Sequence, residues 1–361
     1  MTAPTPHDPT AAPAPAPPAR ALDHLAAAPG WPHAGTDTPL SPDEAGYVAA
    51  ARAHNTRRGY RSVWTSFTAF CTAHDLDALP ATPATVSAYL IALAQGGAKI
   101  RTIAKHLSGI RTAHRTADLP DPAVTARVST VWEGIRRTHG APPEQAPPLM
   151  PPLLDQVIAA CPTTRTWKAR PTEPALTGAR DRALLLIGFW GALRRAELAE
   201  LTVEQLSPER ELRSGRRGRV LTLHRSKTNQ TGEHPDLVGL PRAENPAHCP
   251  LTALEHWLQL ADISTGPILR KVSTGNRILD TPLHPESIND LVAAATTRAS
   301  IPGGPYTAHS LRAGFVTYAH LRGATDRAIA HQTRHRSIDS ITTYIRLDDV
   351  FTDNAVLQLG R

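Results

Sequence analysis

Lysine is scarce in this chain of 361 residues. Only five of its 39 basic residues are lysines, and the others are arginines. In a composition biased toward alanine, proline and arginine, a lysine at a chemically expected position therefore carries extra weight. Cysteine is scarce too. The three cysteines show no spacing typical of a metal site, and so few thiols suggest a reducing cytoplasm.

Long apolar runs are missing as well. The longest, residues 183–193, is too short to span a bilayer and is typical of a buried helix, so no membrane partner is expected. The N-terminus lacks a basic segment followed by an apolar one, and no secretory signal is predicted. Residues 1–40 carry few large apolar side chains among proline, alanine and threonine, which predicts a disordered tail.

Positive charge is what the chain has in excess, with a formal net charge of +7 at pH 7. Such a balance predicts a polyanionic partner. The length leaves room for two domains of ordinary size. The clearest boundary is the proline-rich stretch 141–152, because clustered prolines favour extended conformations over helix. We therefore expect a first domain over residues 41–140, a linker over 141–152, and a second domain over 153–346.

The first domain is predicted to be helical. One apolar stripe recurs at helical spacing through Tyr60, Trp64, Phe67 and Cys71. Further helices are expected after Pro83, around residues 101–115 and over 122–138. Basic residues lie off the apolar faces: Arg57, Arg58, Arg61, Arg101, Lys105, Arg111, Arg115, Arg136 and Arg137. Any one of them is better explained as solvated surface, whereas the whole set predicts phosphate contacts at least as well.

The second domain is predicted to be mainly α with a small antiparallel sheet. Helices are expected over 153–161, 177–191, 192–201, 250–261, 285–298, 309–321, 325–332 and 338–344. Thr177 is a candidate cap for the second of them. Two strands are expected over 219–225 and 237–240, with the turn between them carrying Lys227.

Six side chains from four separate elements form a set suited to phosphoryl transfer: Arg194, Lys227, His309, Arg312, His335 and Tyr344. Two arginines can hold the non-bridging oxygens of a phosphate diester and stabilise developing charge. A tyrosine whose pKa is lowered by nearby cations can attack as the phenolate. A lysine at a strand turn can protonate the departing 5′ oxygen, and histidines can donate hydrogen bonds or relay protons.

Each of these residues also has a plainer interpretation. Arg194 with Glu197, three residues on, is compatible with an ion pair on a helix surface. His331 and His335 are spaced like zinc ligands on a helix, although no third ligand is evident. Tyr344 could pack in the core, and Lys227 could lie in solvent. These plainer interpretations are improbable when all six residues are considered jointly, because chance would have to supply all six in one order.

The combined pattern resembles the tyrosine recombinase, or phage integrase, family. The resemblance is carried by Arg194-x-x-Glu197, Lys227 after a strand, His309-x-x-Arg312, and His335 followed nine residues later by Tyr344. It extends over nearly the whole chain from about residue 45. It implies a helical core-binding domain, a catalytic domain, and a clamp around double-stranded DNA.

By position, the resemblance implies phosphate-binding roles for Arg194 and Arg312, a general acid at Lys227 and a nucleophile at Tyr344. His309 and His335 match the remaining catalytic side chains, and Glu197 a supporting one. The family also implies cleavage through a 3′-phosphotyrosine, a Holliday junction, and a homotetramer on two recombination sites. No metal or other cofactor is expected, and the location is expected to be cytoplasmic and nucleoid-associated, in a bacterium or mobile element.

Two features depart from the family pattern. Arg334 stands where many members have glycine before the second histidine, and it could add a phosphate contact or alter how the next helix begins. Residues 1–40 are too short for an additional arm-binding domain, which favours a simple two-domain recombinase. The tail 347–361 carries apolar residues, and the family implies that it docks on a neighbouring subunit.

Three alternatives remain open from the sequence. A type IB topoisomerase would use similar residues to relax supercoils as a monomer. A noncatalytic DNA-binding protein of the same fold would not need Tyr344. A metallohydrolase is the weakest of the three, and full activity in EDTA would eliminate it.

Overall fold

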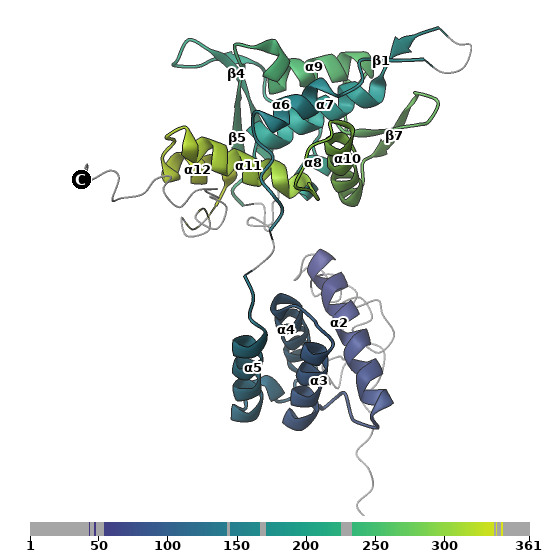
Figure 1. The fold of residues 1–361 in the computed structure, drawn as a ribbon, viewed down its shortest axis with the longest axis vertical. Coiled ribbons are helices and arrows are strands. Elements are labelled where there is room, and N and C mark those ends of the chain that lie inside the picture. Colours follow the sequence, from purple (N-terminus) through teal and green to yellow (C-terminus); the bar gives the residue numbers. More distant parts are fainter. Residues whose placement is uncertain are drawn as a thin grey trace, which may run out of the picture. The chain divides into compact units, whose positions relative to one another are not determined.

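The computed structural model describes residues 43, 47, 54–142, 145–166, 171–224, 233–335, 337 and 341 (Figure 1). The chain divides into two compact units, Met1–Pro143 and Glu144–Arg361. Several sequence-based predictions fall outside the described residues: the tail 1–40, the turn with Lys227, all of the last helix except Ile341, with Tyr344 among the residues left out, and the C-terminal segment 347–361.

The first unit is a helical bundle, as predicted. Its elements are α2 (His54–Ala73), α3 (Pro83–Gln95), α4 (Ile100–Thr116), the 3₁₀ turn η1 (Pro122–Val124) and α5 (Ala126–His139). Trp64, Phe67 and Cys71 of the predicted stripe are buried in the bundle core, while Tyr60 is half-buried at its edge. The helix expected over 122–138 is a 3₁₀ turn followed by α5, because Thr125 is extended between the two.

Helices α2 and α4 pack closely in this bundle. Gly109 permits the approach, since a Cβ built there would lie 2.6 Å from Cγ1 of Val63. Thr82 begins α3 by accepting a hydrogen bond from the backbone N–H of Thr85 at 3.1 Å, and Pro83 follows at the first helical position.

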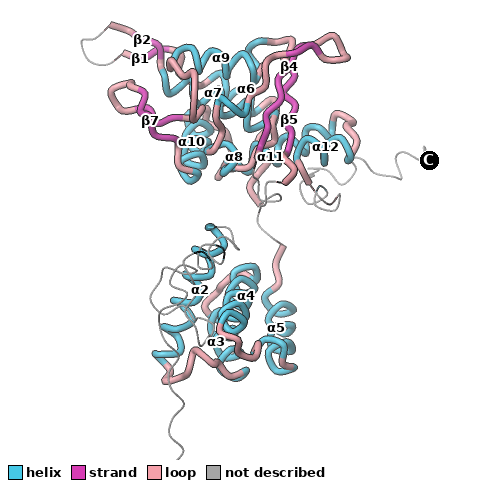
Figure 2. Tube along the Cα trace, turned by 180° about the vertical axis from the view of Figure 1, so that it is seen from behind, coloured by secondary structure: helices cyan, strands magenta, loops and turns pink. Residues whose placement is uncertain are grey.

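The second unit is mainly helical (Figure 2). Its helices are α6 (Leu153–Ala159), α7 (Leu176–Trp190), α8 (Arg195–Ala199), α9 (Pro250–Leu260), α10 (Pro285–Arg298), α11 (Ala308–Leu321) and α12 (Asp326–Thr333), with 3₁₀ turns η2 (Val203–Gln205) and η3 (Pro246–His248). Helix α10 has the predicted bounds. The capping prediction for Thr177 is wrong, because Ala175 precedes the first turn of α7 and Thr177 lies within it.

Among the described residues of this unit, the strands form three small antiparallel sheets. The largest has the order β3 (Arg210–Glu211), β4 (Arg217–Leu223) and β5 (Asp236–Pro241), with Leu221 opposite Val238. The predicted strands correspond to β4 and β5. Two further hairpins were not predicted: β1 (Thr164–Arg165) with β2 (Glu173–Pro174), and β6 (Arg270–Val272) with β7 (Ile278–Pro282).

Helix α7 forms the centre of the second unit and packs against α9 and α11. Its residues Leu184, Leu185 and Leu186 are at most 1% exposed, which confirms that the apolar run is a buried helix. Leu149, from the stretch predicted as a linker, is fully buried in the same core, and its N–H donates to the carbonyl of Ser310 at 2.9 Å. Among the described residues, no helix is both long and apolar enough to cross a membrane.

Candidate active site

The site begins at the turn between α7 and α8. Ala192 adopts φ of 44°, in the left-handed region, and this reverses the chain so that Arg194 directly precedes α8. Glu197 folds back over the start of the helix. Its Oε2 accepts the backbone N–H of Arg194 at 2.8 Å, and its Oε1 pairs with Nη1 of the same arginine at 2.7 Å. Glu197 therefore fixes both the backbone and the side chain of Arg194.

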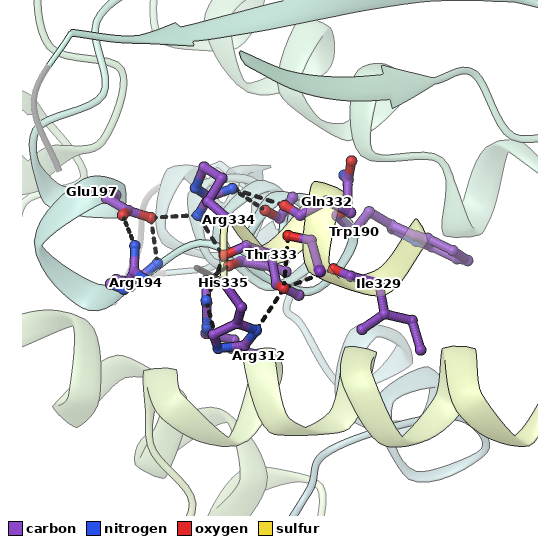
Figure 3. A network of polar contacts seen from close by, with 12 residues as sticks. Trp190, Arg194, Glu197, Arg312, Ile329, Gln332, Thr333, Arg334 and His335 are labelled. Atoms are coloured by element: carbon purple, nitrogen blue, oxygen red, sulfur yellow. Dashed lines mark hydrogen bonds and ion pairs between the residues drawn. The ribbon is translucent and has the colours of Figure 1, made fainter. Parts of the chain in front are cut away.

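Arg312 joins this turn from α11, where it is 1% exposed. Its Nη1 donates to the carbonyl of Ala192 at 2.6 Å, and its Nη2 donates to the carbonyl of Thr333 and contacts Nε2 of His335 at 3.1 Å. One guanidinium thus joins the α7–α8 turn to the end of α12 (Figure 3). The sequence predicted that His309 and Arg312 leave one helix face, but His309 is exposed whereas Arg312 is buried.

His335 follows the end of α12 and is held from both ring nitrogens. Its Nδ1 lies 2.7 Å from Oγ1 of Thr333, whose hydroxyl donates to the carbonyl of Ile329. Because that hydroxyl proton is already used, Nδ1 of His335 carries the ring proton, and Nε2 accepts from Arg312. Thr333 was not identified from the sequence, where a threonine at a helix end gives no distinct signal.

His335 is neutral at physiological pH. Burial, and then the charges of Arg312, Arg194, Arg334 and His309, lower its pKa from 6.5 to about 4. His309, although exposed, is therefore close enough to His335 to act on it electrostatically. The structure brings together Arg194, Glu197, Arg312 and His335, with His309 near them.

Acidification is expected to destabilise the protein through His335. The unfolded chain takes up this proton near pH 6.5 and the folded chain only near pH 4, so the contribution is constant above about pH 6.5 and unfavourable as the pH falls toward 4. Between pH 7 and 4.5 the free energy of unfolding should fall by about 1–3 kcal/mol more in the wild type than in His335→Asn. Denaturant titrations at both pH values measure the difference, and parallel losses in the two proteins would contradict it.

Arg334 lies under the site rather than on its surface. It ends α12 in the left-handed conformation, with φ of 58° and ψ of 41°. Its guanidinium donates to the carbonyls of Gly191 at 3.2 Å and Ala192 at 3.3 Å, and pairs with Oε2 of Glu197 at 2.7 Å. Its charge is paired with the Glu197 carboxylate, which disfavours the phosphate contact considered from the sequence, and it terminates the preceding helix.

Glu197 is consequently an anion between two arginines. Burial would raise its pKa, but the charge of Arg334, followed by the hydrogen bonds and charge of Arg194, outweighs burial and lowers the pKa below its ordinary value. The side chain of Glu197 is 4% exposed and that of Arg194 is 20% exposed. The interpretation of this pair as a solvated helix-surface ion pair is therefore wrong.

The interpretation of His331 and His335 as a helical zinc pair does not fit the backbone. Helix α12 ends at Thr333, so His335 is beyond the helix and its ring turns toward Arg312. Within the described ranges, no three histidine, cysteine, aspartate or glutamate side chains gather as a metal site would require.

The basic residues predicted to contact DNA lie on α2, α4 and α5. Six of them are exposed and three are half-buried: exposed are Arg58, Arg101, Lys105, Arg115, Arg136 and Arg137, and half-buried are Arg57, Arg61 and Arg111. Arg111 and Arg115 both pair with Asp121, at 2.9 Å and 3.3 Å. Their contact with a phosphate would have to compete with this carboxylate.

The chemistry available in the described part is the binding of one anion. The guanidinium groups of Arg194 and Arg312 and the neutral imidazole of His335 lie close together. Each is held in place by hydrogen bonds to neighbouring residues. Such a preorganised set can stabilise charge on the oxygens of a phosphate. Lys227 and Tyr344 lie outside the described residues.

Comparison with known proteins identifies two curated relatives. It is 30% identical over 309 residues to an integrase/recombinase xerD homolog of Selenomonas ruminantium, covering 85% of each chain. It is 27% identical over 210 residues to recombinase cre of Escherichia phage P1, covering 57% of this chain and 55% of that protein. No protein-family model matches the sequence.

Solved structures share the fold at low sequence identity. XerH recombinase, in a post-cleavage complex with a palindromic difH substrate, aligns with a TM-score of 0.55 at 14% identity over 88% of this chain and 82% of that chain. A lambda integrase dimer bound to a COC′ core site aligns with a TM-score of 0.53 at 16% identity over 83% and 75%. The Tn1549 transposon integrase in complex with transposon right end DNA gives 0.54 at 14% identity over 86% and 94%.

Proposed function

The chain belongs to the tyrosine recombinase (phage integrase) family, and we propose that it is a site-specific recombinase that cleaves and rejoins double-stranded DNA through Tyr344. The observation that supports the proposal is that Arg194, Arg312 and His335 lie close together in the second unit. These are the residues that the family pattern assigns to the scissile phosphate.

In the proposed reaction, Arg194 and Arg312 hold the non-bridging oxygens of the scissile phosphate. The Tyr344 oxygen forms a bond to phosphorus as the bond to the 5′ oxygen breaks, which leaves a 3′-phosphotyrosine. Lys227 protonates the departing 5′ oxygen. His309 donates a hydrogen bond or relays the phenol proton, and His335, neutral above about pH 4, can accept that proton at Nε2 in place of its contact with Arg312. Attack by a 5′ hydroxyl on the phosphotyrosine reverses the step and rejoins DNA without ATP.

Three of the other tyrosines are disfavoured as the nucleophile by their surroundings, which supports the choice of Tyr344. The hydroxyls of Tyr60 and Tyr89 bind Ser108 and His106 within the first unit. Tyr306 is buried and donates to the carbonyl of Pro302 at 2.8 Å, and burial raises its pKa. A raised pKa or an occupied hydroxyl disfavours attack as the phenolate.

We further propose that the nine basic residues of α2, α4 and α5 contact DNA phosphates, and that the two domains form a clamp on the duplex. Four protomers would assemble on two sites and exchange strands through a Holliday junction. The tail 347–361 would dock on a neighbouring protomer. Glu197 would support Arg194 without touching DNA.

A paired-site assay tests the proposed function. Two copies of a site, selected by binding from DNA flanking the gene, are placed on one supercoiled plasmid. We expect recombinant products, and we expect a chain truncated after Asp349 to lose them together with tetramer formation on DNA. Relaxed topoisomers without recombinants would contradict the proposal and favour a type IB topoisomerase.

A further inference from the structure

Arg334 adopts a backbone conformation that a residue with a Cβ rarely takes. Its φ of 58° lies in the region where glycine is favoured. Arginine at this position therefore requires compensation from its side chain. The compensation is visible: the guanidinium bonds to Gly191, Ala192 and Gln332 carbonyls and to the Glu197 carboxylate, with 4% of the side chain exposed.

The charges around Glu197 depend on Arg334. Arg194 and Glu197 alone would form a neutral pair at 2.7 Å, in which the carboxylate cancels the charge that a phosphate needs. Arg334 pairs with the other carboxylate oxygen, also at 2.7 Å, so the three side chains together carry one positive charge. This positive charge is accessible to a ligand at Arg194, whose side chain is 20% exposed, rather than at Arg334, whose side chain is 4% exposed.

Arg334 also supports the turn that both phosphate-binding arginines use. The Ala192 carbonyl accepts from Nη2 of Arg334 at 3.3 Å and from Nη1 of Arg312 at 2.6 Å. The same turn leads directly into Arg194. Figure 3 shows Glu197 joined by dashed lines to both Arg194 and Arg334, with His335 and Arg312 lower in the view.

We propose that Arg334 is a positioning residue for DNA cleavage, which compensates the charge of Glu197 so that the guanidinium of Arg194 is free to bind the scissile phosphate. The inference rests on the proposed function. Arg334 touches no DNA in this account and acts through Glu197 and the Ala192 turn. With glycine at position 334, Arg194 would be the one remaining cation of these three side chains, and its charge would be cancelled by Glu197.

Charge rescue tests the role. In Arg334→Met the side chain keeps its approximate length and loses its charge, and we expect single-turnover cleavage of a suicide substrate to slow about 10–100-fold, with the Kd for DNA within about threefold of wild type. Adding Glu197→Gln removes the uncompensated carboxylate. The double variant should cleave at least about fivefold faster than Arg334→Met, because the net charge returns to +1.

A purely structural role gives the opposite pattern, since two buried substitutions would then slow cleavage further. Arg334→Gly provides a second background, in which the left-handed backbone is unstrained and the same rescue by Glu197→Gln is expected. Wild-type cleavage in either single variant, or a double variant no faster than its single parent, would overturn the inference. Failure of the wild type to form any covalent adduct would instead refute the proposed function.

Discussion

Tyr344→Phe is expected to abolish covalent attachment to DNA. The substitution removes one oxygen, the proposed nucleophile, and leaves the ring in place. Loss of a nucleophile that acts in a catalytic group costs several orders of magnitude, so adduct formation should fall by at least about 10⁴-fold. Binding to the same DNA should change by less than about threefold. Denaturing gel electrophoresis of the protein with labelled suicide substrate measures both the rate and the extent.

A matched control is available in the same unit. Tyr306 is 4% exposed and its hydroxyl donates to the carbonyl of Pro302. Tyr306→Phe removes the same oxygen and should cost about 0.5–1.5 kcal/mol of stability while leaving the adduct intact. Normal adduct formation by Tyr344→Phe, or its loss in Tyr306→Phe at full folding, would contradict the assignment of the nucleophile.

Arg312→Gln is expected to cause the second large loss. Glutamine is neutral and too short to reach Ala192, Thr333 and His335 together, so both the proposed phosphate contact and the support of the site are lost. Cleavage should fall by about 10³-fold or more. Stability should fall by about 1–3 kcal/mol, because buried acceptors lose their donor. Single-turnover cleavage well below the melting temperature separates the two effects.

Arg180 provides the control for burial. It is 5% exposed, pairs with Asp181 at 2.8 Å and lies in α7. Arg180→Gln should destabilise the fold to a similar extent yet leave cleavage near the wild-type rate when the protein is folded. Equal loss of cleavage in the two variants would show that Arg312 matters only for folding.

The sequence predicted the helices well where their boundaries have a local cause. Pro285 stands at the first helical position of α10, and its predicted bounds match. The apolar spacing of α2 predicted its buried face in the same way. The hairpins β1–β2 and β6–β7 could not be predicted, because their short strands are mostly exposed and carry no alternation of apolar and polar residues.

The candidate site was predictable in part. Motif spacing indicated that Arg194, Arg312 and His335 meet, and the structure brings them together. The depth of Arg312 was not predictable, since position on a helix face does not say how far the core extends. The inward direction of Arg334 depends on a left-handed backbone that arginine rarely adopts, and no sequence pattern signals it. In the sequence, position 334 was notable only because arginine stands where many family members have glycine.

The central claim is that one aromatic hydroxyl takes the DNA strand while the arginines hold its phosphate. Mass spectrometry of the peptide left after protease and nuclease digestion of the trapped protein–DNA adduct tests this most directly. We expect a nucleotide joined through a 3′ phosphate to Tyr344. A nucleotide on any other side chain, a 5′ linkage, or cleaved DNA with no attached peptide would contradict it.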